Sequence, residues 1–500
     1  MTDIILNFHD YSHVYVETKE SIFRELKSAL AFYADGYQFH PKFKYGTWDG
    51  KISLLDNDRL LPIGLVPHLT KYAKTNEFTI SIHDLIIHKN PLTKLEFIDW
   101  MDSRKYYSGS EEIVPYWYQV NAVFESLTNK RRILNLPTSA GKSLIQAMLT
   151  KYMIENTNKS VLILVPTVNL CTQMKDDLID YRLFKDSEIG LLKSGSKLSN
   201  QRVVVSTWQS AIKKPADWFD QFGMLLCDEM HLAIGKSIST IIKKLKYCEY
   251  KIGLSGSLRD GKANLMQYVG LFGGIYNPVT TAQLMEEGQV TKLKINSLFL
   301  KYPEKVSSAM TNADYPTEIK FITSLQKRTD WVANLAMKIS ARNENSFIMF
   351  KHLEHGKKIH DALKAKGHTK AYYVAGDVTP EERNKFKKMA EEDSGIVIIA
   401  SYGVFSTGIS VKNLHHVIFA HPVKSKIIVL QTVGRVLRKH KSKAIATIWD
   451  LIDDMSISVE KNGIKSRKNV NYALKHGIER LERYGIENFD YSMKDIFFLK

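Results

Sequence analysis

The chain has 500 residues, of which 44% are hydrophobic and 25% are charged, so it is too long for a single core and reads as a globular protein of several domains. Its formal net charge of +17 favours a polyanionic partner, most commonly nucleic acid, although charge that only aids solubility is an alternative. No apolar run is long enough to span a membrane, no secretory signal stands at the N-terminus, and the three cysteines are too scattered for a disulfide frame or a zinc site. We therefore expect an intracellular soluble protein with no membrane partner.

Residues 1–92 predict a small N-terminal α/β domain. Strands are predicted at 4–8, 13–17 and 77–82, a helix over 20–34, and a hairpin turn at Asp49-Gly50. Aromatic and basic residues interleave between 37 and 51, a pattern typical of nucleic-acid binding, and the candidate contacts are Lys42, Lys44, Trp48 and Lys51. In so short a domain, about half of the aromatic residues are expected to form its core instead.

Short apolar strands then alternate with helices, which predicts two lobes with buried parallel sheets. In the first lobe, 93–300, the strands are predicted at 133–136, 161–165, 203–205, 224–227 and 252–254. Residues 301–321 are predicted to link the lobes. In the second lobe, 322–455, the strands are predicted at 347–350, 371–374, 396–400, 416–419 and 444–448. Residues 456–500 predict a helical C-terminal tail with a basic start.

The segment Leu136-Pro-Thr-Ser-Ala-Gly-Lys-Ser143 follows a predicted strand and is typical of a phosphate-binding loop. Lys142 is predicted to reach the β- and γ-phosphates of a nucleotide, and the Ser143 hydroxyl is predicted to ligate Mg²⁺. The rest of the predicted cradle is Pro137, Thr138, Ser139, Ala140 and Gly141. Leu136 replaces the usual first glycine, and taken alone the segment is also compatible with an ordinary helix start.

Two adjacent acids, Asp228 and Glu229, follow the apolar run 224–227. At the end of a buried strand, Asp228 is predicted to hold Mg²⁺ and Glu229 to accept a proton from the attacking water. An Asp-Glu pair is also common in solvated loops, but its place downstream of the Lys142 loop favours catalysis.

A third segment, Gln431-Thr-Val-Gly-Arg-Val-Leu-Arg438, carries two arginines three residues apart, which predicts one shared helix face. Arg435 and Arg438 are predicted to stabilise charge on the transferred phosphate, and Gln431 makes the pattern less generic. A basic helix that only touches nucleic acid is the alternative.

Taken in order, these segments resemble superfamily 2 helicases of the DExH type over residues 112–450. The resemblance implies tandem RecA-like lobes that hydrolyse ATP with Mg²⁺, and it implies that Gln119 reads adenine and that Gly408 lies at the nucleotide. It implies contacts to the nucleic-acid backbone by Pro166, Thr167, Ser206, Thr207, Lys351 and Thr407. Ser255-Gly256-Ser257 stands where the family couples hydrolysis to motion.

A closer resemblance, carried by Trp48-Asp-Gly-Lys51 and Pro62-Ile-Gly64, is to phage recombination helicases within this superfamily. It implies unwinding and branch migration of DNA junctions and forks, and action on RNA–DNA hybrids such as R-loops, in recombination, repair and replication control. The implied partners are branched, double-stranded and single-stranded DNA and RNA–DNA hybrid. We expect a monomer, in the host cytoplasm if the source is viral.

Several positions depart from the family pattern: Leu136, Ser139, Ser257, Leu258 and Ser410. Two alternatives stay open. One is an RNA helicase with the same core, because discrimination between DNA and RNA depends on 2′-OH contacts. The other is a passive strand-annealing protein with a vestigial ATPase, against which the intact Lys142, Asp228 and Glu229 argue.

Overall fold

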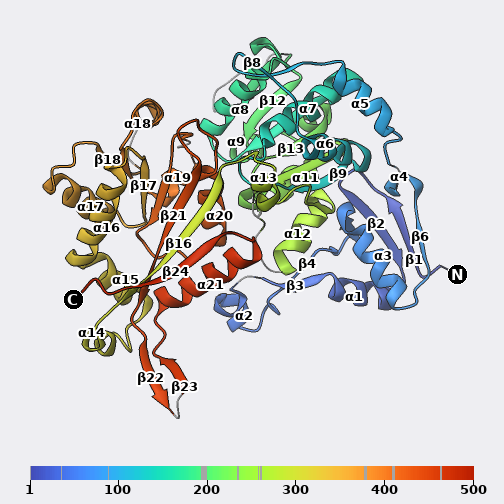
Figure 1. Ribbon diagram of the computed structural model, residues 1–500. Coiled ribbons are helices and arrows are strands. Elements are labelled where there is room, and N and C mark those ends of the chain that lie inside the picture. The colour runs from blue at the N-terminus through green and yellow to red at the C-terminus, as the bar shows by residue number, and fades with distance from the viewer. Residues whose placement is uncertain are drawn as a thin grey trace. The chain divides into compact units, whose positions relative to one another are not determined.

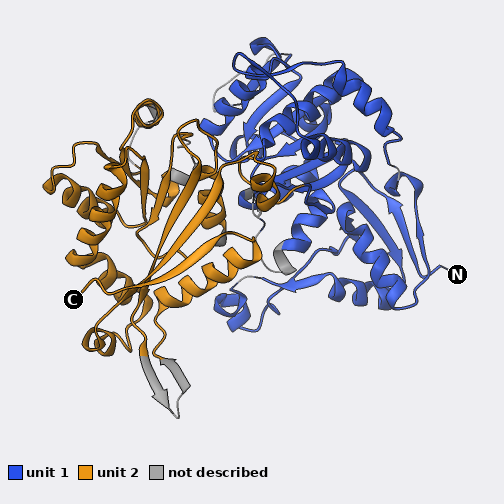
Figure 2. Cartoon of the chain, in the orientation of Figure 1, with its two compact units in different colours: residues 1–136, 140–278 blue, residues 137–139, 279–500 orange. Residues whose placement is uncertain are grey.

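A computed structural model of the chain describes residues 2–34, 36–87, 89–192, 200–233, 236–256, 258, 262–376, 380–407, 411–461 and 464–499. Contacts divide the chain into two compact units (Figure 2). The first unit contains residues 1–136 and 140–278, and the second contains residues 137–139 and 279–500. Each unit is built around one seven-stranded sheet (Figure 1).

The first unit opens with a four-stranded sheet in the order β5-β2-β1-β6. Alternate residues of β1 and β2 are apolar and fully buried, since side chains on a strand point to opposite faces in turn. The elements of this N-terminal module are β1 (Ile4–Phe8), β2 (His13–Thr18), α1 (Glu20–Ala29), β3 (Ala31–Tyr33), η1 (Tyr37–Phe39), α2 (Pro41–Lys44), β4 (Lys51–Ser53), β5 (Leu60–Pro62), η2 (Ile63–Leu65), α3 (Val66–Thr75), β6 (Ile80–Ile82) and α4 (Asp84–Ile87).

The predicted hairpin at Asp49-Gly50 is wrong. Strand β4 pairs with β3, so the chain between the two strands is a long excursion through α2 rather than a two-residue turn. Gly50 has a φ of +80°, and a Cβ there would lie 2.5 Å from the Tyr37 ring. The glycine is therefore required by the close approach of an aromatic ring and by its left-handed backbone. The predicted helix over 20–34 also ends early, at Ala29, because the chain continues into β3.

The N-terminal module shares one apolar core with the lobe that follows it. Helix α12 (Lys262–Phe272) lies so close to η2 that a Cβ on Gly64 would be 2.0 Å from the Val269 carbonyl oxygen. The Ser12 hydroxyl donates a hydrogen bond to the Ile242 carbonyl at 2.7 Å. The module and the first lobe thus form one unit, whereas the sequence predicted a separate domain.

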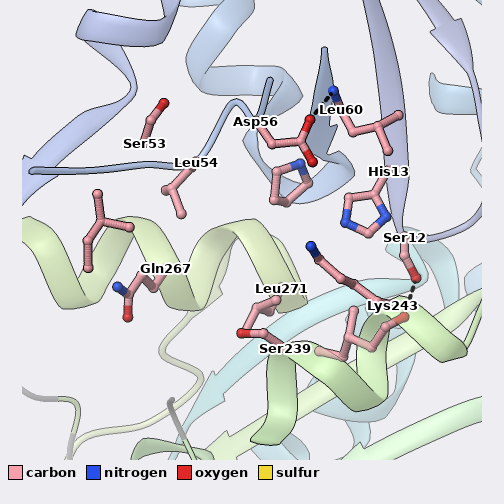
Figure 3. A pocket seen from close by; sticks show the side chains of 13 residues that line it. Ser12, His13, Ser53, Leu54, Asp56, Leu60, Ser239, Lys243, Gln267 and Leu271 are labelled. Carbon is pink, nitrogen blue, oxygen red and sulfur yellow. Dashed lines mark hydrogen bonds between the residues drawn. The ribbon is translucent and has the colours of Figure 1, made fainter. Parts of the chain in front are cut away.

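A pocket of about 410 Å³ lies at this junction (Figure 3). His13 and Asp56 border it from the module, and Lys243 borders it from α11 (Lys236–Lys244). None of the predicted nucleotide-binding residues lines it. The pocket therefore marks the seam between module and lobe, away from the predicted chemistry.

The sheet of the first lobe is parallel, with strand order β11-β12-β10-β13-β14-β9-β15. Its central strands are buried along their whole length, as continuous apolar runs predict for a parallel sheet covered on both faces. The elements are α5 (Lys94–Asp102), β7 (Tyr106–Ser108), β8 (Glu111–Ile113), α6 (Trp117–Asn129), β9 (Arg131–Asn135), α7 (Lys142–Asn156), β10 (Ser160–Val165), α8 (Val168–Asp180), η3 (Asp186–Glu188), β11 (Ile189–Leu192), β12 (Val203–Thr207), α9 (Trp208–Ala211), η4 (Asp217–Gln221), β13 (Phe222–Cys227), α10 (Met230–Ala233), β14 (Tyr250–Ser255) and β15 (Ile275–Tyr276), with α11 before and α12 after β14.

The second unit repeats this build, with strand order β18-β19-β17-β20-β21-β16-β24. All of these strands are parallel, and α16 and α17 pack beside one another (Figure 1). The elements are α13 (Thr281–Glu286), β16 (Lys292–Lys301), α14 (Glu304–Ala309), α15 (Tyr315–Ser324), α16 (Gln326–Ser340), β17 (Ser346–Phe350), α17 (Leu353–Ala365), β18 (Ala371–Val374), α18 (Pro380–Glu392), β19 (Val397–Ser401), α19 (Tyr402–Thr407), β20 (His416–Phe419), α20 (Lys426–Val436), β21 (Ile445–Asp454), β22 (Ile457–Lys461), β23 (Ile464–Lys468), α21 (Tyr472–Ile486) and β24 (Tyr491–Ile496).

The α/β class with two parallel-sheet lobes is confirmed, but the predicted boundaries around the second lobe differ from the structure. Strand β16 belongs to the second sheet, so the first lobe does not reach residue 300, and α14 and α15 occupy the predicted linker at 301–321. The described residues of the predicted helical tail form one helix, α21, together with the antiparallel pair β22-β23 and the sheet strand β24. Among the described residues, no helix is both long and apolar enough to cross a membrane.

Candidate nucleotide-binding site

The predicted site residues of the first unit gather at one edge of its sheet. The phosphate loop follows β9, Thr167 follows β10, Thr207 ends β12 and Asp228 follows β13. Because parallel strands run in the same direction, their carboxyl ends share an edge, and open α/β sheets bind ligands there. The fold thus brings together residues that are up to about a hundred positions apart in the chain.

The loop between β9 and α7 has the backbone of a phosphate cradle. Gly141 has a φ of +71° and directly precedes Lys142, the first residue of α7. A Cβ on Gly141 would lie 2.2 Å from Gln119 Nε2, so both the conformation and the space require glycine. Backbone N–H groups in the first turn of a helix have no partner within the helix and point toward its N-terminal end, where they bind anions. Lys142 and Ser143 therefore lie where phosphates would be held.

Gln119, the predicted adenine reader, lies against this loop. It is 3% exposed, its side-chain oxygen accepts a hydrogen bond from the Tyr116 N–H at 2.8 Å, and its Nε2 donates to the Ala140 carbonyl at 3.0 Å. Tyr116 and Trp117 beside it remain partly exposed. The glutamine thus links the segment before α6 to the phosphate loop, and its contact with adenine stays a prediction.

The acid pair lies beside Lys142. The Lys142 Nζ is 3.8 Å from Glu229 Oε1. Asp228 directly precedes Glu229 and follows Cys227, the last residue of β13. Burial, and then the neighbouring Glu229 carboxylate, raise the pKa of Asp228 to about 7, while Lys142 acts in the opposite direction. Asp228 Oδ1 is buried and has no hydrogen-bond partner among the residues that the structure describes. A buried carboxylate oxygen in this condition needs a cation or a donor.

These residues fit Mg²⁺. The Ser143 hydroxyl and the Asp228 carboxylate are hard oxygen donors, and the buried Asp228 Oδ1 leaves a ligand position open. In nucleotide sites Mg²⁺ takes one or two protein ligands, substrate phosphates and several waters, which matches so small a donor set. When bound, the ion would neutralise charge on the phosphates.

Sequence reasoning did not assign a role to His231, although it closes the Asp228-Glu-Met-His231 segment. Its ring is buried, and its Nδ1 lies 2.9 Å from Ser255 Oγ and 3.4 Å from Glu229 Oε2. His231 therefore joins the predicted base to the end of β14. Ser257, which follows Ser255 in the predicted coupling segment, lies outside the described residues.

The predicted nucleic-acid contacts of the first lobe differ in exposure. Pro166 and Thr167 are half-buried at the start of α8, where the Thr167 side chain caps the helix by accepting from the Leu170 N–H. Ser206 is fully buried, and its Oγ lies 2.9 Å from the Thr207 carbonyl oxygen. Thr207 is 5% exposed and caps α9. A direct contact by the Ser206 hydroxyl is therefore not supported, because that side chain serves the backbone of its own segment.

In the N-terminal module, the aromatic residues Phe39 and Tyr45 are 79% and 82% exposed, so they are not core residues. Lys42 and Lys44 are exposed on α2. Trp48 is half-buried, and its Nε1 donates to the Lys51 carbonyl at 2.7 Å. Basic and aromatic side chains are thus exposed on the module, and their contact with nucleic acid stays a prediction.

In the second unit, Lys351 is exposed after β17, and Gln431 and Arg435 lie on α20. This helix ends at Val436, so Arg438 lies beyond it, and the prediction that the two arginines share a helix face is wrong. Leu437 is the C-cap residue that follows the helix, and the Arg438 carbonyl accepts a hydrogen bond from the Thr291 hydroxyl. By its contacts, the segment 137–139 of the phosphate loop belongs to the second unit.

Two predicted positions of the second unit cannot be assessed. The Thr407 side chain and Gly408 lie outside the described part of the chain, as does Ser410.

Comparison with protein families defines the class. Residues 112–260 match the family described as "Type III restriction enzyme, res subunit", and residues 327–440 match "Helicase conserved C-terminal domain". With two parallel-sheet lobes and a phosphate loop, the chain is a superfamily 2 helicase, an ATP-dependent enzyme. Residues 3–83 match "DNA helicase UvsW, N-terminal".

Two full-length similarities narrow the class. The chain is 54% identical over 500 residues to "ATP-dependent DNA helicase uvsW" of Enterobacteria phage T4, with 99% of each sequence covered. It matches the crystal structure of T4 UvsW with a TM-score of 0.55 and 52% identity, with 100% of each chain covered. The chain therefore belongs to the UvsW family of DNA helicases. It is also 31% identical over 185 residues to "DNA 3'-5' translocase XPB2" of Sulfurisphaera tokodaii, covering 37% of this chain and 39% of the relative.

Proposed function

We propose that this chain is an ATP-dependent DNA helicase that unwinds and branch-migrates junctions and forks and dissociates RNA–DNA hybrids such as R-loops, in recombination, repair and replication control. The observation that supports the catalytic role is the approach of Lys142 Nζ to Glu229 Oε1, at 3.8 Å, beside Asp228, whose Oδ1 is buried. The DNA substrate is supported by the full-length similarity to the T4 helicase.

The chemistry follows from the site. Lys142 and the first turn of α7 would hold the β- and γ-phosphates, and Glu229 would take the proton of the attacking water. Ser143 and Asp228 would hold Mg²⁺, which supplies charge neutralisation. His231 would keep the Glu229 carboxylate in place. Gln431, Arg435 and Arg438 would offset charge on the transferred phosphate.

Nucleic acid would be gripped through its backbone, by the Pro166–Thr167 segment, the Thr207 segment, Lys351 and Thr407. Contacts to phosphate and sugar carry no sequence information, so the enzyme would act on any sequence. The exposed Phe39, Tyr45, Lys42 and Lys44 would supply stacking and charge at single-stranded or branched DNA. We infer a monomeric intracellular enzyme.

The test is ATP hydrolysis in the presence of single-stranded DNA, duplex, a four-way junction, an R-loop or single-stranded RNA, with strand separation scored in parallel. We expect the strongest stimulation from branched DNA or R-loops, with ATP-dependent product formation. The Lys142→Ala variant should lose both hydrolysis and unwinding while still annealing strands. Stimulation by RNA alone would favour an RNA helicase. No stimulation by any polymer, with annealing that survives Lys142→Ala, would favour a passive annealing protein.

A further inference from the structure

A tyrosine outside all of the recognised segments contacts the serine of the predicted metal site. The Tyr181 hydroxyl oxygen lies 2.7 Å from Ser143 Oγ, and either atom can be the donor. Ser143 lies in the first turn of α7, and Tyr181 is the C-cap residue directly after α8, 38 positions further along the chain. Both residues belong to the first unit and are half-buried.

The backbone around Tyr181 is held on both sides. The Asp180 carboxylate accepts a hydrogen bond from the Gly109 N–H at 2.9 Å, and the Arg182 guanidinium lies 3.9 Å from the centre of the Tyr107 ring. Gly109 follows β7, and Tyr107 lies on it, so the end of α8 is fixed to the β7-β8 pair. A side chain anchored in this way can hold its hydroxyl in one place.

The last turn of α8 also lies close to the acid pair. After burial and the Glu229 carboxylate, Asp177 is a further group whose negative charge raises the pKa of Asp228. Asp177 precedes Tyr181 by one helical turn, and its carbonyl accepts the Tyr181 N–H. The end of α8 therefore borders Ser143 and lies within electrostatic range of Asp228.

A serine hydroxyl has one proton and two lone pairs, and a metal ion can use only a lone pair. If the proton points toward the metal, the oxygen cannot coordinate it. A fixed acceptor on the other side of the oxygen removes this conflict, in the same way that groups behind a metal ligand orient it.

We propose that Tyr181 is a positioning residue for Mg²⁺: its oxygen accepts the Ser143 proton and turns the lone pairs of Ser143 Oγ toward the metal. The proposal rests on the proposed role of Ser143 and Asp228 in Mg²⁺ binding. It adds a residue, at the end of α8, on which the affinity for the metal depends.

The test compares Tyr181→Phe with the unmodified chain in the binding of fluorescently labelled ADP, in EDTA and across a titration with MgCl₂. The variant removes the hydroxyl and keeps the ring. We expect its affinity for metal-free ADP to be unchanged and the concentration of Mg²⁺ needed for half of the metal effect to rise about tenfold, the lower end of what loss of an orienting partner costs. This readout does not depend on turnover.

The matched control is Tyr250→Phe, which removes a tyrosine hydroxyl from the same unit. That hydroxyl accepts from Asn90 Nδ2 at 3.1 Å, and we expect its loss to leave the Mg²⁺ titration unchanged. Thermal unfolding of both variants would show whether each is folded, and an unfolded Tyr181→Phe would be replaced by Tyr181→Leu, which also removes the acceptor, with the same expected rise in the Mg²⁺ requirement.

The outcomes are distinct. An Mg²⁺ titration of Tyr181→Phe that coincides with that of the unmodified chain overturns the role of Tyr181 alone. An equal loss of ADP affinity with and without metal also overturns it, because that pattern indicates general damage to the loop. If the unmodified chain itself binds ADP equally with and without Mg²⁺, the proposed metal site fails, and the role of Tyr181 fails with it.

Discussion

At the scale of single residues, Glu229 combines an uncommon backbone with a defined surrounding. Its φ is +44°, in the left-handed region that residues other than glycine seldom occupy, and such conformations cluster at functional sites. Lys142 and His231 lie within 4 Å of its two carboxylate oxygens. The backbone turn and these two neighbours together aim the carboxylate at the phosphate loop.

We therefore expect Glu229→Gln to bind ATP with near-normal affinity and to hydrolyse it at least about a hundredfold more slowly, because a general base contributes at least that factor. Single-turnover hydrolysis and nucleotide binding, measured together, check this. Glu249→Gln is the matched control, since Glu249 forms an ion pair with Lys130 at 2.6 Å instead. Hydrolysis by Glu229→Gln at a rate close to that of the control would exclude Glu229 as the base.

A second prediction at this scale concerns Lys251 and the pH dependence of the free energy of unfolding. Its side chain is fully buried on β14, and its Nζ donates to the Tyr11 carbonyl at 2.8 Å. Burial lowers the pKa of Lys251 from 10.5 to about 7. Between these two values the unfolded chain binds a proton that the folded chain lacks. The free energy of unfolding should therefore rise with pH in this window, by up to about 1.4 kcal/mol per pH unit from this group.

The measurement is chemical unfolding of the chain and of Lys251→Met at pH values from 7 to 10. We expect the difference between their unfolding free energies to change with pH in the stated direction, as the slope due to Lys251 is absent from the variant. Parallel pH profiles would show that Lys251 keeps an ordinary pKa in the folded protein.

At the scale of elements, α21 is fixed to the second sheet by a buried charge pair. The Arg480 guanidinium donates to Asp450 on β21, with Nη2 2.7 Å from Oδ1, and the Tyr484 hydroxyl donates to the same carboxylate at 3.0 Å. At the start of the helix, the Glu318 carboxylate accepts the N–H groups of Tyr472 and Ala473. Helix α21 is therefore part of the lobe rather than an appended tail.

Arg480→Met should destabilise the second unit by about 3–5 kcal/mol, because it leaves the buried Asp450 carboxylate without its main partner. The double change Arg480→Met with Asp450→Asn should recover part of this loss, since the uncompensated charge is then gone. Urea unfolding of the two variants measures both effects. A single variant as stable as the parent would mean that the pair contributes nothing to holding α21.

The elements that sequence predicted well are those with a local signal. The strands at 161–165 and 224–227 are continuous apolar runs and were found within two residues of their observed ends. Strand β16 was missed although lysines alternate with apolar residues at its start, which is a strand pattern. Strand β24 is almost entirely exposed and owes its form to pairing with β16, with Ile295 opposite Tyr491. Pairing between distant segments leaves no local pattern in the chain.

The residues of the site differ in the same way: some have a local sequence signal, and others depend on contacts between distant segments. Lys142, Asp228 and Glu229 were predicted because each lies in a short segment after an apolar strand. The Tyr181–Ser143 contact was not predicted, because it depends on where α8 ends relative to α7. The end of α20 before Arg438 was also missed, since Val436 and Leu437 carry no sequence signal for a helix end.

At the scale of the whole molecule, the net charge of +17 indicates strong, salt-dependent attraction to nucleic acid, but it does not say which lysines make contact. The N-terminal module offers a comparison within one fold. Lys42 and Lys44 are exposed on α2 near the exposed rings of Phe39 and Tyr45, whereas Lys71 and Lys74 are exposed on α3.

Replacing Lys42 and Lys44 together by alanine should reduce the slope of log affinity against log salt for duplex or forked DNA by about 1.8, since each phosphate contact contributes about 0.9. The Lys71→Ala, Lys74→Ala chain loses the same charge from the same module, so long-range attraction falls equally in both variants. The two slopes therefore separate contact from net charge. If they fall together, α2 does not touch DNA, and the aromatic and basic surface acts only through its contribution to the field of the whole protein.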